Sequence, residues 1–519
     1  MTLTHTAQIV RPRPEVPRDK PALVHDGVVT TFGELDAGSS QVAQGLLAAG
    51  VQFGDRIAFV APASDEYFHV LFGASKIGAI TVPINPAFTS DELGYVLTDC
   101  EPAVVVSTTQ VRDRVAAAGL RFDSVVLWLL SDGVAGGANT LAAWRSRKPS
   151  DDVDVAIPAD SDATIQYTSG SSGRPKGVVC THRNMMARAP DPIRSQPFER
   201  WTSDDVALLD LPICHISGTM WGVNALAQGA SVVVCARFDP AQVLEAIRMW
   251  RVSKLVVVPT TLRMIMSQPG VADVDFSSVN YMLYGSAPMD PASFSLASTT
   301  FGCAVVHGYG LTESGTVTRM PPDDATVEGD RWRSVGLPSP GLEVRIADPH
   351  GNDVPPRQVG EILVRGAANM DRYWRRPDDT AATIDESGWL RTGDAGYLDE
   401  GGYLFLHDRI KDIIISGGEN VSSAEVERVL VEHPAVAEVA VIGLPHPEWG
   451  EQVHALVVRA GDVAGDELIE FARLKLTKYK VPKSVEFVDQ FPRTATGKIL
   501  KSELRRSHAS GAEPTTSSR

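Results

Sequence analysis

A loop rich in glycine and hydroxyl side chains ends at a lysine. Residues 167–177 read YTSGSSGRPKG and follow a segment at 163–166 that resembles a strand. Glycine permits backbone conformations in which successive N–H groups point at one anion, and Lys176 adds a positive charge. The pattern predicts a loop that wraps a polyphosphate, and it differs from G-x-x-x-x-G-K-[ST] because Lys176 precedes glycine. The structural alternative is a flexible Gly/Ser-rich surface loop. The candidate phosphate-binding residues are Thr168, Ser169, Gly170, Ser171, Ser172, Gly173 and Lys176.

Two further loops follow predicted strands, where open α/β sheets commonly bind ligands. Residues 285–288 read GSAP after the strand-like run 281–284, and residues 308–314 read GYGLTES after the run 303–306. For Glu313, in the second of these loops, one interpretation is structural: a carboxylate at the start of a helix, where the helix dipole stabilises it.

The elements that must position these loops alternate between strands and helices. Runs 231–234 and 255–258 predict buried strands, and between them Asp239 suits an N-cap and Pro240 the first helical position. Strand, capped helix and strand form a βαβ unit, and repeated units predict a parallel sheet. After residue 336, alternating runs at 342–346 and 361–365 predict a smaller antiparallel or barrel-like section.

The length of the chain predicts more than one domain. Its 519 residues are too many for one ordinary hydrophobic core. The expected fold is α/β, with a large N-terminal domain of βαβ-built sheets and the barrel-like section at residues 1–410. A small α+β C-terminal domain follows at 411–508. Residues 509–519 end in a Ser/Thr-rich stretch and predict a disordered tail.

The composition excludes several classes of protein. Hydrophobic residues make up 43% and charged residues 22%, which is ordinary for a globular chain and excludes general disorder. A net charge of -16 argues against nucleic-acid binding, which needs a basic face. The five cysteines lack any C-x-x-C spacing and predict reduced thiols in a cytoplasmic protein. No apolar run approaches the ~18 residues of a transmembrane helix, so only peripheral membrane contact stays open.

The loop at 167–177 resembles the signature loop of the adenylate-forming superfamily. That superfamily includes acyl-CoA synthetases, the adenylation domains of peptide synthetases and beetle luciferases. The strings GYGLTE at 308–313, IISGGENV at 414–421 and RTATGKILK at 493–501 extend the resemblance over nearly the whole chain. The strings at 308–312 and 414–421 suit the fatty-acid–CoA ligase type best.

The resemblance implies residues that bind ATP and its magnesium ion. The loop at 285–288 and the Gly-Tyr-Gly segment at 308–310 would flank adenine. Thr312 would contact phosphate, and Glu313 would help to hold Mg²⁺, which prefers hard oxygen ligands. Asp394 would accept both ribose hydroxyls, and Arg409 would contact ribose and phosphate. Adenine would lie between Gly285, Ser286, Ala287, Pro288, Gly308, Tyr309 and Gly310.

The segment LPICHISG at 211–218 resembles the part of the family that lines the acid pocket. His215 would lie beside the carboxylate, and the structural alternative is a histidine buried in the core. For Met220 and Trp221, the alternative is that both side chains simply pack in the hydrophobic core. The implied pocket residues are His215, Ser217, Gly218, Met220 and Trp221.

The C-terminal strings imply a domain that moves between two steps. Lys498 resembles the catalytic lysine that bridges the acid and the α-phosphate, whereas a lysine in a basic C-terminal stretch is otherwise exposed and inert. Lys411 resembles the hinge about which the small domain turns. Glycine allows close backbone approach, so the loop of Ser416, Gly417 and Gly418 would admit the pantetheine arm of the thiol.

The implied function is an AMP-forming acid–thiol ligase. A carboxylic acid, in particular a fatty acid, would react with ATP to give an acyl-adenylate and pyrophosphate, and the acyl group would then pass to coenzyme A. An acyl carrier protein with its phosphopantetheine thiol is the alternative acceptor. Less favoured are a luciferase-like oxygenase and a non-catalytic acyl-binding protein, which would be expected to lose Lys498 or the phosphate loop. The acid, its chain length and the oligomeric state are not specified by the sequence.

Overall fold

The computed structural model describes residues 3–132, 139–153, 155–168, 174–190, 197–285, 289, 291–322, 331–416, 419–447, 449–493 and 499–509. The chain divides into two compact units. The first contains Met1–Val344 and Val364–Leu390, and the second contains Arg345–Leu363 and Arg391–Arg519. The domain boundary expected after residue 410 stays a prediction.

A nine-stranded sheet with the order β15-β14-β13-β12-β11-β9-β10-β1-β2 belongs to the first unit. Its central strands pair in parallel, as the βαβ pattern predicted, and antiparallel pairs occur only at its two edges. Its strands are β1 (Pro21–His25), β2 (Val28–Thr31), β9 (Val206–Leu209), β10 (Ser231–Val234), β11 (Lys254–Val257), β12 (Tyr281–Tyr284), β13 (Ala304–Leu311), β14 (Gly315–Arg319) and β15 (Leu337–Pro338).

A seven-stranded sheet, ordered β18-β8-β7-β4-β3-β5-β6, belongs to the same unit. It is parallel from β7 to β6, while β8 and β18 pair antiparallel beside it. Its strands are β3 (Arg56–Val60), β4 (Ile80–Pro83), β5 (Val104–Ser107), β6 (Leu127–Leu130), β7 (Asp162–Thr168), β8 (Lys176–Thr181) and β18 (Arg372–Tyr373).

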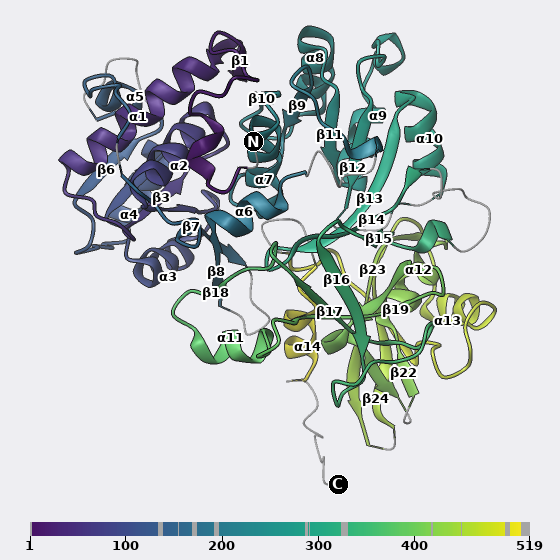
Figure 1. The fold of residues 1–519 in the computed structure, drawn as a ribbon. Helices are drawn as coiled ribbons and strands as arrows, with labels where there is room; N and C mark the ends of the chain where they lie inside the picture. The colour runs from purple at the N-terminus through teal and green to yellow at the C-terminus, as the bar shows by residue number, and fades with distance from the viewer. Residues whose placement is uncertain are drawn as a thin grey trace. The chain divides into compact units, whose positions relative to one another are not determined.

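Helices cover both faces of both sheets, which explains why their strands are apolar on both sides. In β5, Val104 and Val106 enter one core while Val105 enters another. The first of these cores lies between the sheets and includes α1, α2 and α7, while α8, α9 and α10 cover the outer face of the nine-stranded sheet (Figure 1). The helices are α1 (Phe32–Ala48), α2 (Asp65–Ile77), α3 (Ser90–Cys100), α4 (Thr109–Ala117), α5 (Leu141–Arg145), α6 (His182–Arg188), α7 (Ile216–Ala227), α8 (Pro240–Trp250), α9 (Pro259–Met266), α10 (Pro291–Phe301) and α11 (Pro377–Thr383).

The predicted capping of α8 occurs in the structure. The side chain of Asp239 accepts hydrogen bonds from the backbone of Ala241 and Gln242, and Pro240 occupies the first helical position. A side chain that satisfies these otherwise unpaired N–H groups defines where the helix begins. Short 3-10 helices occur at Thr6–Ile9, Pro197–Glu199, Val271–Asp273, Arg331–Arg333 and Ile410–Asp412.

The second unit contains a five-stranded sheet and most residues of a four-stranded sheet. The section predicted as antiparallel or barrel-like forms the four-stranded sheet, of order β16-β17-β19-β20. Its strands are β16 (Leu342–Ala347), β17 (Gly360–Gly366), β19 (Leu390–Leu398) and β20 (Leu404–Arg409).

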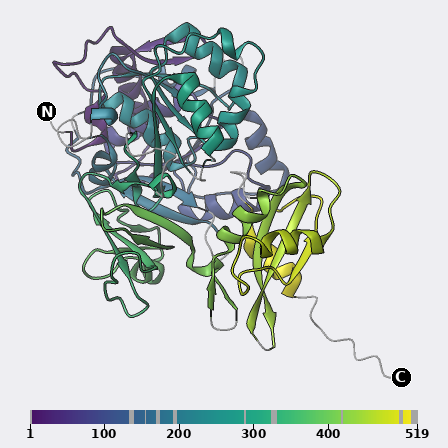
Figure 2. The same ribbon diagram turned by 90° about the vertical axis from the view of Figure 1, so that its right-hand side faces the viewer.

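The five-stranded sheet carries helices on both faces, shown from green to yellow in Figure 2. Val441 and Val453 pack with α12 and α13 on one face, whereas Ile442 and Leu456 pack with Leu504 of α14 on the other. Its elements are β21 (Ile414–Ser416), β22 (Glu419–Val421), α12 (Ser423–Val431), β23 (Val436–His446), β24 (Gly450–Arg459), α13 (Gly465–Arg473), β25 (Ser484–Phe487) and α14 (Lys501–Ala509).

Candidate active site

A tight turn between two antiparallel strands carries Thr312 and Glu313. β13 ends at Leu311 and β14 begins at Gly315, and Leu311 pairs with Gly315 across the ladder. A Cβ added at Gly310 would lie 2.1 Å from the carbonyl oxygen of Gly315, so only glycine lets the strands approach this closely. Glu313 therefore lies in a hairpin turn, and the alternative of a carboxylate at a helix start is wrong.

The carboxylate of Glu313 is oriented by a residue distant in sequence. The Tyr373 hydroxyl donates a 2.8 Å hydrogen bond to Glu313 Oε1. Arg188 is buried, and its guanidinium donates to the carbonyl oxygens of Ala368 at 2.7 Å and Glu313 at 3.3 Å. Met370 N also donates to the Glu313 carbonyl at 2.6 Å. Backbone and side chain of Glu313 are thus both held from outside the turn.

Lys176, the cation of the predicted phosphate loop, already has an anionic partner. Its Nζ lies 2.6 Å from Asp379 Oδ1 and 5.3 Å from the centroid of the Tyr373 ring. Lys176 opens β8, and Asp379 belongs to α11. The pair is partly exposed, so Lys176 can exchange Asp379 for a phosphate at low energetic cost. Tyr373 links this cation to the carboxylate of Glu313.

The strand ends expected beside adenine lie next to each other. Tyr284 and His307, on paired strands β12 and β13, stack with ring centroids 4.5 Å apart and an interplanar angle of 6°. Burial lowers the pKa of His307 to about 4, so the ring is neutral at physiological pH. A Cβ added at Gly285 would lie 2.7 Å from the Gly308 carbonyl oxygen, which brings the two loops into close approach. Tyr309 follows in β13 and is buried.

His215 and Gly218 lie at the start of helix α7. His215 is the residue before the helix, and burial lowers the pKa of its imidazole. A Cβ added at Gly218 would lie 2.3 Å from the Pro212 carbonyl oxygen, so glycine lets the preceding loop pack on the helix. Ser217 is exposed at this position, whereas Met220 and Trp221 are buried.

A pocket of about 80 Å³ opens along the next turns of α7. Three of the predicted acid-pocket residues, Ser217, Met220 and Trp221, line it, while His215 and Gly218 do not. Trp221 packs edge-on against Trp201 with ring centroids 5.1 Å apart. The full lining is Pro190, Glu199, Trp201, Ser217, Met220, Trp221, Asn224, Val256, Tyr281, Leu283, Thr316 and Arg319.

The wall of this pocket contains a buried ion pair. Arg319 of β14 lies 2.7 Å from Glu199 Oε1, and their side chains are 15% and 4% exposed. Within the described part of the chain, Arg319 Nε and Asn224 Oδ1 have no hydrogen-bond partner. Such polar atoms are costly to bury unpaired, and they suit a polar group on a ligand.

Asp394 and Arg409, the implied ribose partners, form an ion pair in the second unit. They are cross-strand neighbours in β19 and β20, and Arg409 Nε lies 2.7 Å from Asp394 Oδ1. Asp394 is buried, and its N–H donates to Thr392 Oγ1 at 3.1 Å. Gly393 before it has φ +69°, a conformation that favours glycine.

The hinge and thiol-access candidates lie close together along the second unit. Lys411 is exposed in the short 3-10 helix Ile410–Asp412. Ser416 is buried and pairs with Glu419 across the β21–β22 hairpin. The other predictions for the site lie outside the described residues: Ser169, Gly170, Ser171, Ser172, Gly173, Ser286, Ala287, Pro288, Gly417, Gly418 and Lys498.

Sequence reasoning missed Tyr373, Asp379 and Arg188. Tyr373 belongs to a two-residue strand, too short for a periodic pattern, and its partner Glu313 is 60 residues away. Arg188 and Asp379 lie on the short helices α6 and α11, where charged residues are common on solvated faces. Arg188 is nevertheless buried, and no local pattern indicates that.

The oxygen donors at the hairpin turn fit a magnesium ion. Glu313 is partly buried, and only one of its carboxylate oxygens has a hydrogen-bond donor among the described residues. The hydroxyl-bearing Thr312 precedes it. Mg²⁺ prefers hard oxygen ligands and keeps part of its shell for water and phosphate, as this sparse donor set would allow.

Comparison with known proteins identifies the family of the chain. Residues 10–374 match the model of the AMP-binding enzyme family, and residues 425–498 match the AMP-binding enzyme C-terminal domain. The fatty acid–[acyl-carrier-protein] ligase ScoC of Streptomyces coeruleorubidus is 36% identical over 494 residues, with 93% of each chain covered. A feruloyl-CoA synthase of Amycolatopsis sp is 38% identical, with 93% of this chain and 95% of the relative covered.

Solved structures show the same fold. ATP-bound MatB from Rhodopseudomonas palustris superposes with a TM-score of 0.88 at 32% identity, covering 98% of this chain and all of that one. The α/β fold with a large N-terminal and a small C-terminal domain is thereby confirmed. Across the described ranges, no helix combines the length and apolar character needed to cross a membrane.

Proposed function

This chain belongs to the AMP-binding enzyme family, and we propose which of its residues carry the family's chemistry. The protein is an AMP-forming acid–thiol ligase. It joins a carboxylic acid to ATP as an acyl-adenylate with release of pyrophosphate, and a thiol then takes the acyl group and releases AMP. Its substrates are the acid, ATP and coenzyme A, and Mg²⁺ accompanies ATP. A cytoplasmic location stays a prediction.

Adenylation brings two anions together, so the site must stabilise developing negative charge. We assign the phosphates to the loop that runs from Thr168 to Lys176, and a magnesium ion to Glu313, where it would neutralise charge on the phosphates. Tyr373 orients Glu313 through its 2.8 Å hydrogen bond. Lys498 is the proposed catalytic lysine that orients the acid and the α-phosphate.

The nucleoside is assigned to two sets of residues. Adenine is assigned to the segment near the Tyr284–His307 stack, between Gly285 and the Gly308–Gly310 segment, where the strand ends lie in close approach. Ribose is assigned to Asp394, whose carboxylate is held in place by Arg409 at 2.7 Å. A carboxylate oriented in this way is suited to accept hydrogen bonds from neighbouring hydroxyl groups.

For the acid, we propose an aromatic acid that carries a hydroxyl or another polar group at its far end. The observation that supports this class is the polar wall of the α7 pocket, with its Glu199–Arg319 pair and the unpaired atoms of Asn224 and Arg319. A long saturated chain would leave Asn224 Oδ1 and Arg319 Nε unpaired, which is the costly case. The walls also contain the rings of Trp201, Trp221 and Tyr281, which suit an aromatic ligand. The relative named feruloyl-CoA synthase supports the same class.

A fatty acid is the second candidate. It follows from the resemblance of the strings at 308–312 and 414–421, and the relatives named as fatty-acid ligases support it. The first of these names an acyl carrier protein as its acceptor, so a holo-carrier protein is the alternative to coenzyme A as thiol.

Pyrophosphate release with a panel of acids tests these proposals. The panel pairs 4-hydroxycinnamate with cinnamate, adds dodecanoate and hexadecanoate, and offers coenzyme A and a holo-carrier protein side by side. We expect 4-hydroxycinnamate to exceed cinnamate in kcat/KM by roughly tenfold, as expected for about one good hydrogen bond. The Asn224→Leu variant should lose that preference while retaining activity on cinnamate. Faster turnover of hexadecanoate than of either aromatic acid would reject the aromatic class.

A further inference from the structure

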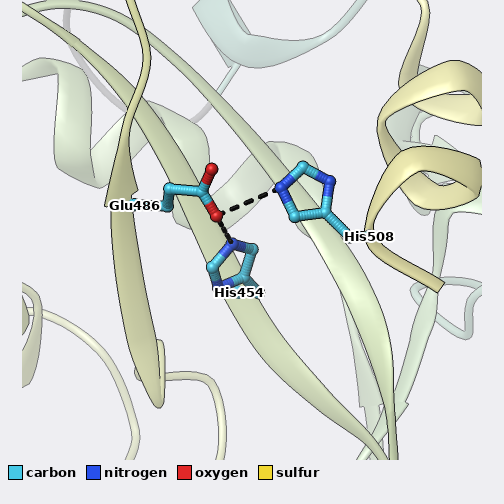
Figure 3. Close-up of side chains that lie close together, drawn as sticks. All are labelled: His454, Glu486 and His508. Atoms are coloured by element: carbon cyan, nitrogen blue, oxygen red, sulfur yellow. Dashed lines mark hydrogen bonds and ion pairs between the residues drawn. The ribbon is translucent and has the colours of Figure 1, made fainter. Parts of the chain in front are cut away.

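A cluster of two histidines and a glutamate lies in the second unit, and none of the three is assigned to the reaction. His454 belongs to β24, Glu486 to the neighbouring strand β25, and His508 to α14 (Figure 3). One atom from each side chain faces the others, and these three atoms lie within 4.8 Å of one another. Imidazole nitrogen and carboxylate oxygen are both ligands that Zn²⁺ accepts.

The hydrogen bond of the His508 ring leaves two acceptor atoms facing each other. His508 Nδ1 lies 2.7 Å from the carbonyl oxygen of Leu504, which can only accept, so Nδ1 carries the hydrogen. In the neutral ring, Nε2 is then a lone-pair acceptor, and it lies 3.1 Å from Glu486 Oε2. Two acceptors at this distance repel unless a positive charge lies between them. That charge is either a proton on His508 or a metal ion.

The contacts of His454 favour a metal ion over a proton in the cluster. Its Nδ1 is hydrogen-bonded to Ser484 Oγ at 2.7 Å, which aims Nε2 at Glu486 Oε2, 3.7 Å away. Its side chain is 7% exposed, and Nε2 has no hydrogen-bond partner anywhere in the described ranges. A proton shared by His508 and Glu486 would leave this buried nitrogen unsatisfied, whereas a metal ion would be bound by all three side chains.

The distances from Glu486 Oε2 to the two histidine nitrogens are close to the ligand spacing of a tetrahedral zinc site. Ligands at about 2.0–2.1 Å from Zn²⁺ lie roughly 3.3 Å apart in a tetrahedron. The two distances to Glu486 Oε2, 3.1 and 3.7 Å, bracket that value. The other ring nitrogens are bonded to Ser484 and Leu504, which is how histidine ligands are commonly oriented in metal sites. Glu486 is half exposed, so an ion can enter from solvent.

We propose that His454, Glu486 and His508 bind a divalent transition-metal ion of the Zn²⁺ class, with water as the fourth ligand. The ion joins α14 to strands β24 and β25. Because α14 begins three residues after Lys498, the site anchors the helix that follows the proposed catalytic lysine. An ion that binds the folded chain and not the unfolded chain stabilises the folded state by mass action.

Metal titration of untagged, full-length protein tests this site. The protein is stripped with a chelator and desalted, excess Mg²⁺ is added, and Zn²⁺ uptake is measured against a chromophoric competitor. Thermal unfolding with and without Zn²⁺ is the second readout. The variants are Glu486→Gln and His508→Gln, whose side chains are 48% and 21% exposed, with His350→Gln as a histidine control outside the cluster.

We expect the native chain to bind one Zn²⁺ that both cluster variants bind at least tenfold more weakly, and that His350→Gln retains. Zn²⁺ should raise the midpoint of thermal unfolding in the native and control proteins and not in the cluster variants. Equal Zn²⁺ affinity in all four proteins would place the ion elsewhere, for example on a cysteine, and would overturn the proposal. Absence of uptake by the native chain in excess Zn²⁺ would show that a proton occupies the cluster instead, and would overturn the proposal.

Discussion

The hydroxyl of Tyr373 donates to Glu313 across 60 residues of sequence, at 2.8 Å. The ring of the same tyrosine lies 5.3 Å from the ammonium group of Lys176. One side chain therefore contacts both charged groups that the sequence predicts for ATP and magnesium binding. We therefore propose that Tyr373 is a positioning residue, which would act on the substrates through Glu313 and Lys176.

Removing the Tyr373 hydroxyl should slow adenylation when the Mg²⁺ concentration is limiting. Tyr373→Phe keeps the ring beside Lys176 and deletes only the donor to Glu313. Hydrogen bonds to charged groups contribute about 1.5–3 kcal/mol, so we expect adenylation at limiting Mg²⁺ to fall by roughly tenfold or more. Pyrophosphate release measured as a function of Mg²⁺ checks this. Tyr479→Phe in the second unit is the control, and an unchanged Mg²⁺ dependence in Tyr373→Phe would refute the positioning role.

The two half-reactions should depend differently on Lys498. Lys498→Ala removes the cation assigned to the acid and the α-phosphate, so adenylation should fall on the order of 100-fold or more. Thioester formation from a supplied acyl-adenylate should remain close to that of the native protein. Pyrophosphate release and thioester yield are measured separately. Equal loss in both would mean that Lys498 acts in folding or in general substrate binding.

The proposed hinge at Lys411 predicts the reverse of the Lys498→Ala result: adenylation should be retained and thioester formation impaired. Lys411→Pro restricts φ to about -65° at an exposed residue of a short 3-10 helix. A restricted hinge should leave pyrophosphate release within about twofold of the native rate and lower thioester formation about tenfold. Lys411→Ala, which removes the side chain and leaves the backbone mobile, should support both steps. If Lys411→Ala is as defective as Lys411→Pro, the side chain matters rather than the backbone.

Asp210 should make stability fall as pH rises. It follows β9 and is 5% exposed, and burial raises its pKa from 3.8 to about 7. Between these values the folded state keeps a proton that the unfolded state has released, so the free energy of unfolding decreases with pH, by up to about 1.4 kcal/mol per unit. Asp210→Asn cannot titrate, so it should gain stability over the native protein from pH 4 to pH 7.

Denaturant titrations at several pH values measure that gain. Asp123→Asn, at an exposed position, is the matched control and should follow the native curve. A difference between Asp210→Asn and the native protein that does not change with pH would show that Asp210 keeps an ordinary pKa when folded.

The regular elements were predictable because their signals are local. Strands at 231–234 and 281–284 occur as β10 and β12, and the capped helix predicted from Asp239 occurs as α8, which continues to Trp250. Apolar runs and capping residues act on their own neighbours, so they can be recognised without tertiary information.

The contacts within the site were less predictable. Glu313 lies in a hairpin turn because β13 pairs antiparallel with β14, and that pairing depends on the close approach at Gly310. Lys176 is paired with Asp379 across 203 residues, and no local pattern can indicate such a partner. The Arg319–Glu199 pair in the wall of the α7 pocket, 120 residues apart, was missed for the same reason.

Strand β14 has implications for redesigning this enzyme toward new acids. It leads from the turn that carries Glu313 to Thr316 and Arg319 in the pocket wall. Mutations on it that reshape the pocket would also disturb the turn at Gly315, against which Gly310 has no spare room. Trp201, Trp221 and Asn224 lie on other segments of the chain and contact the same pocket. Libraries confined to those three positions should broaden the range of acids accepted while leaving the phosphate chemistry intact.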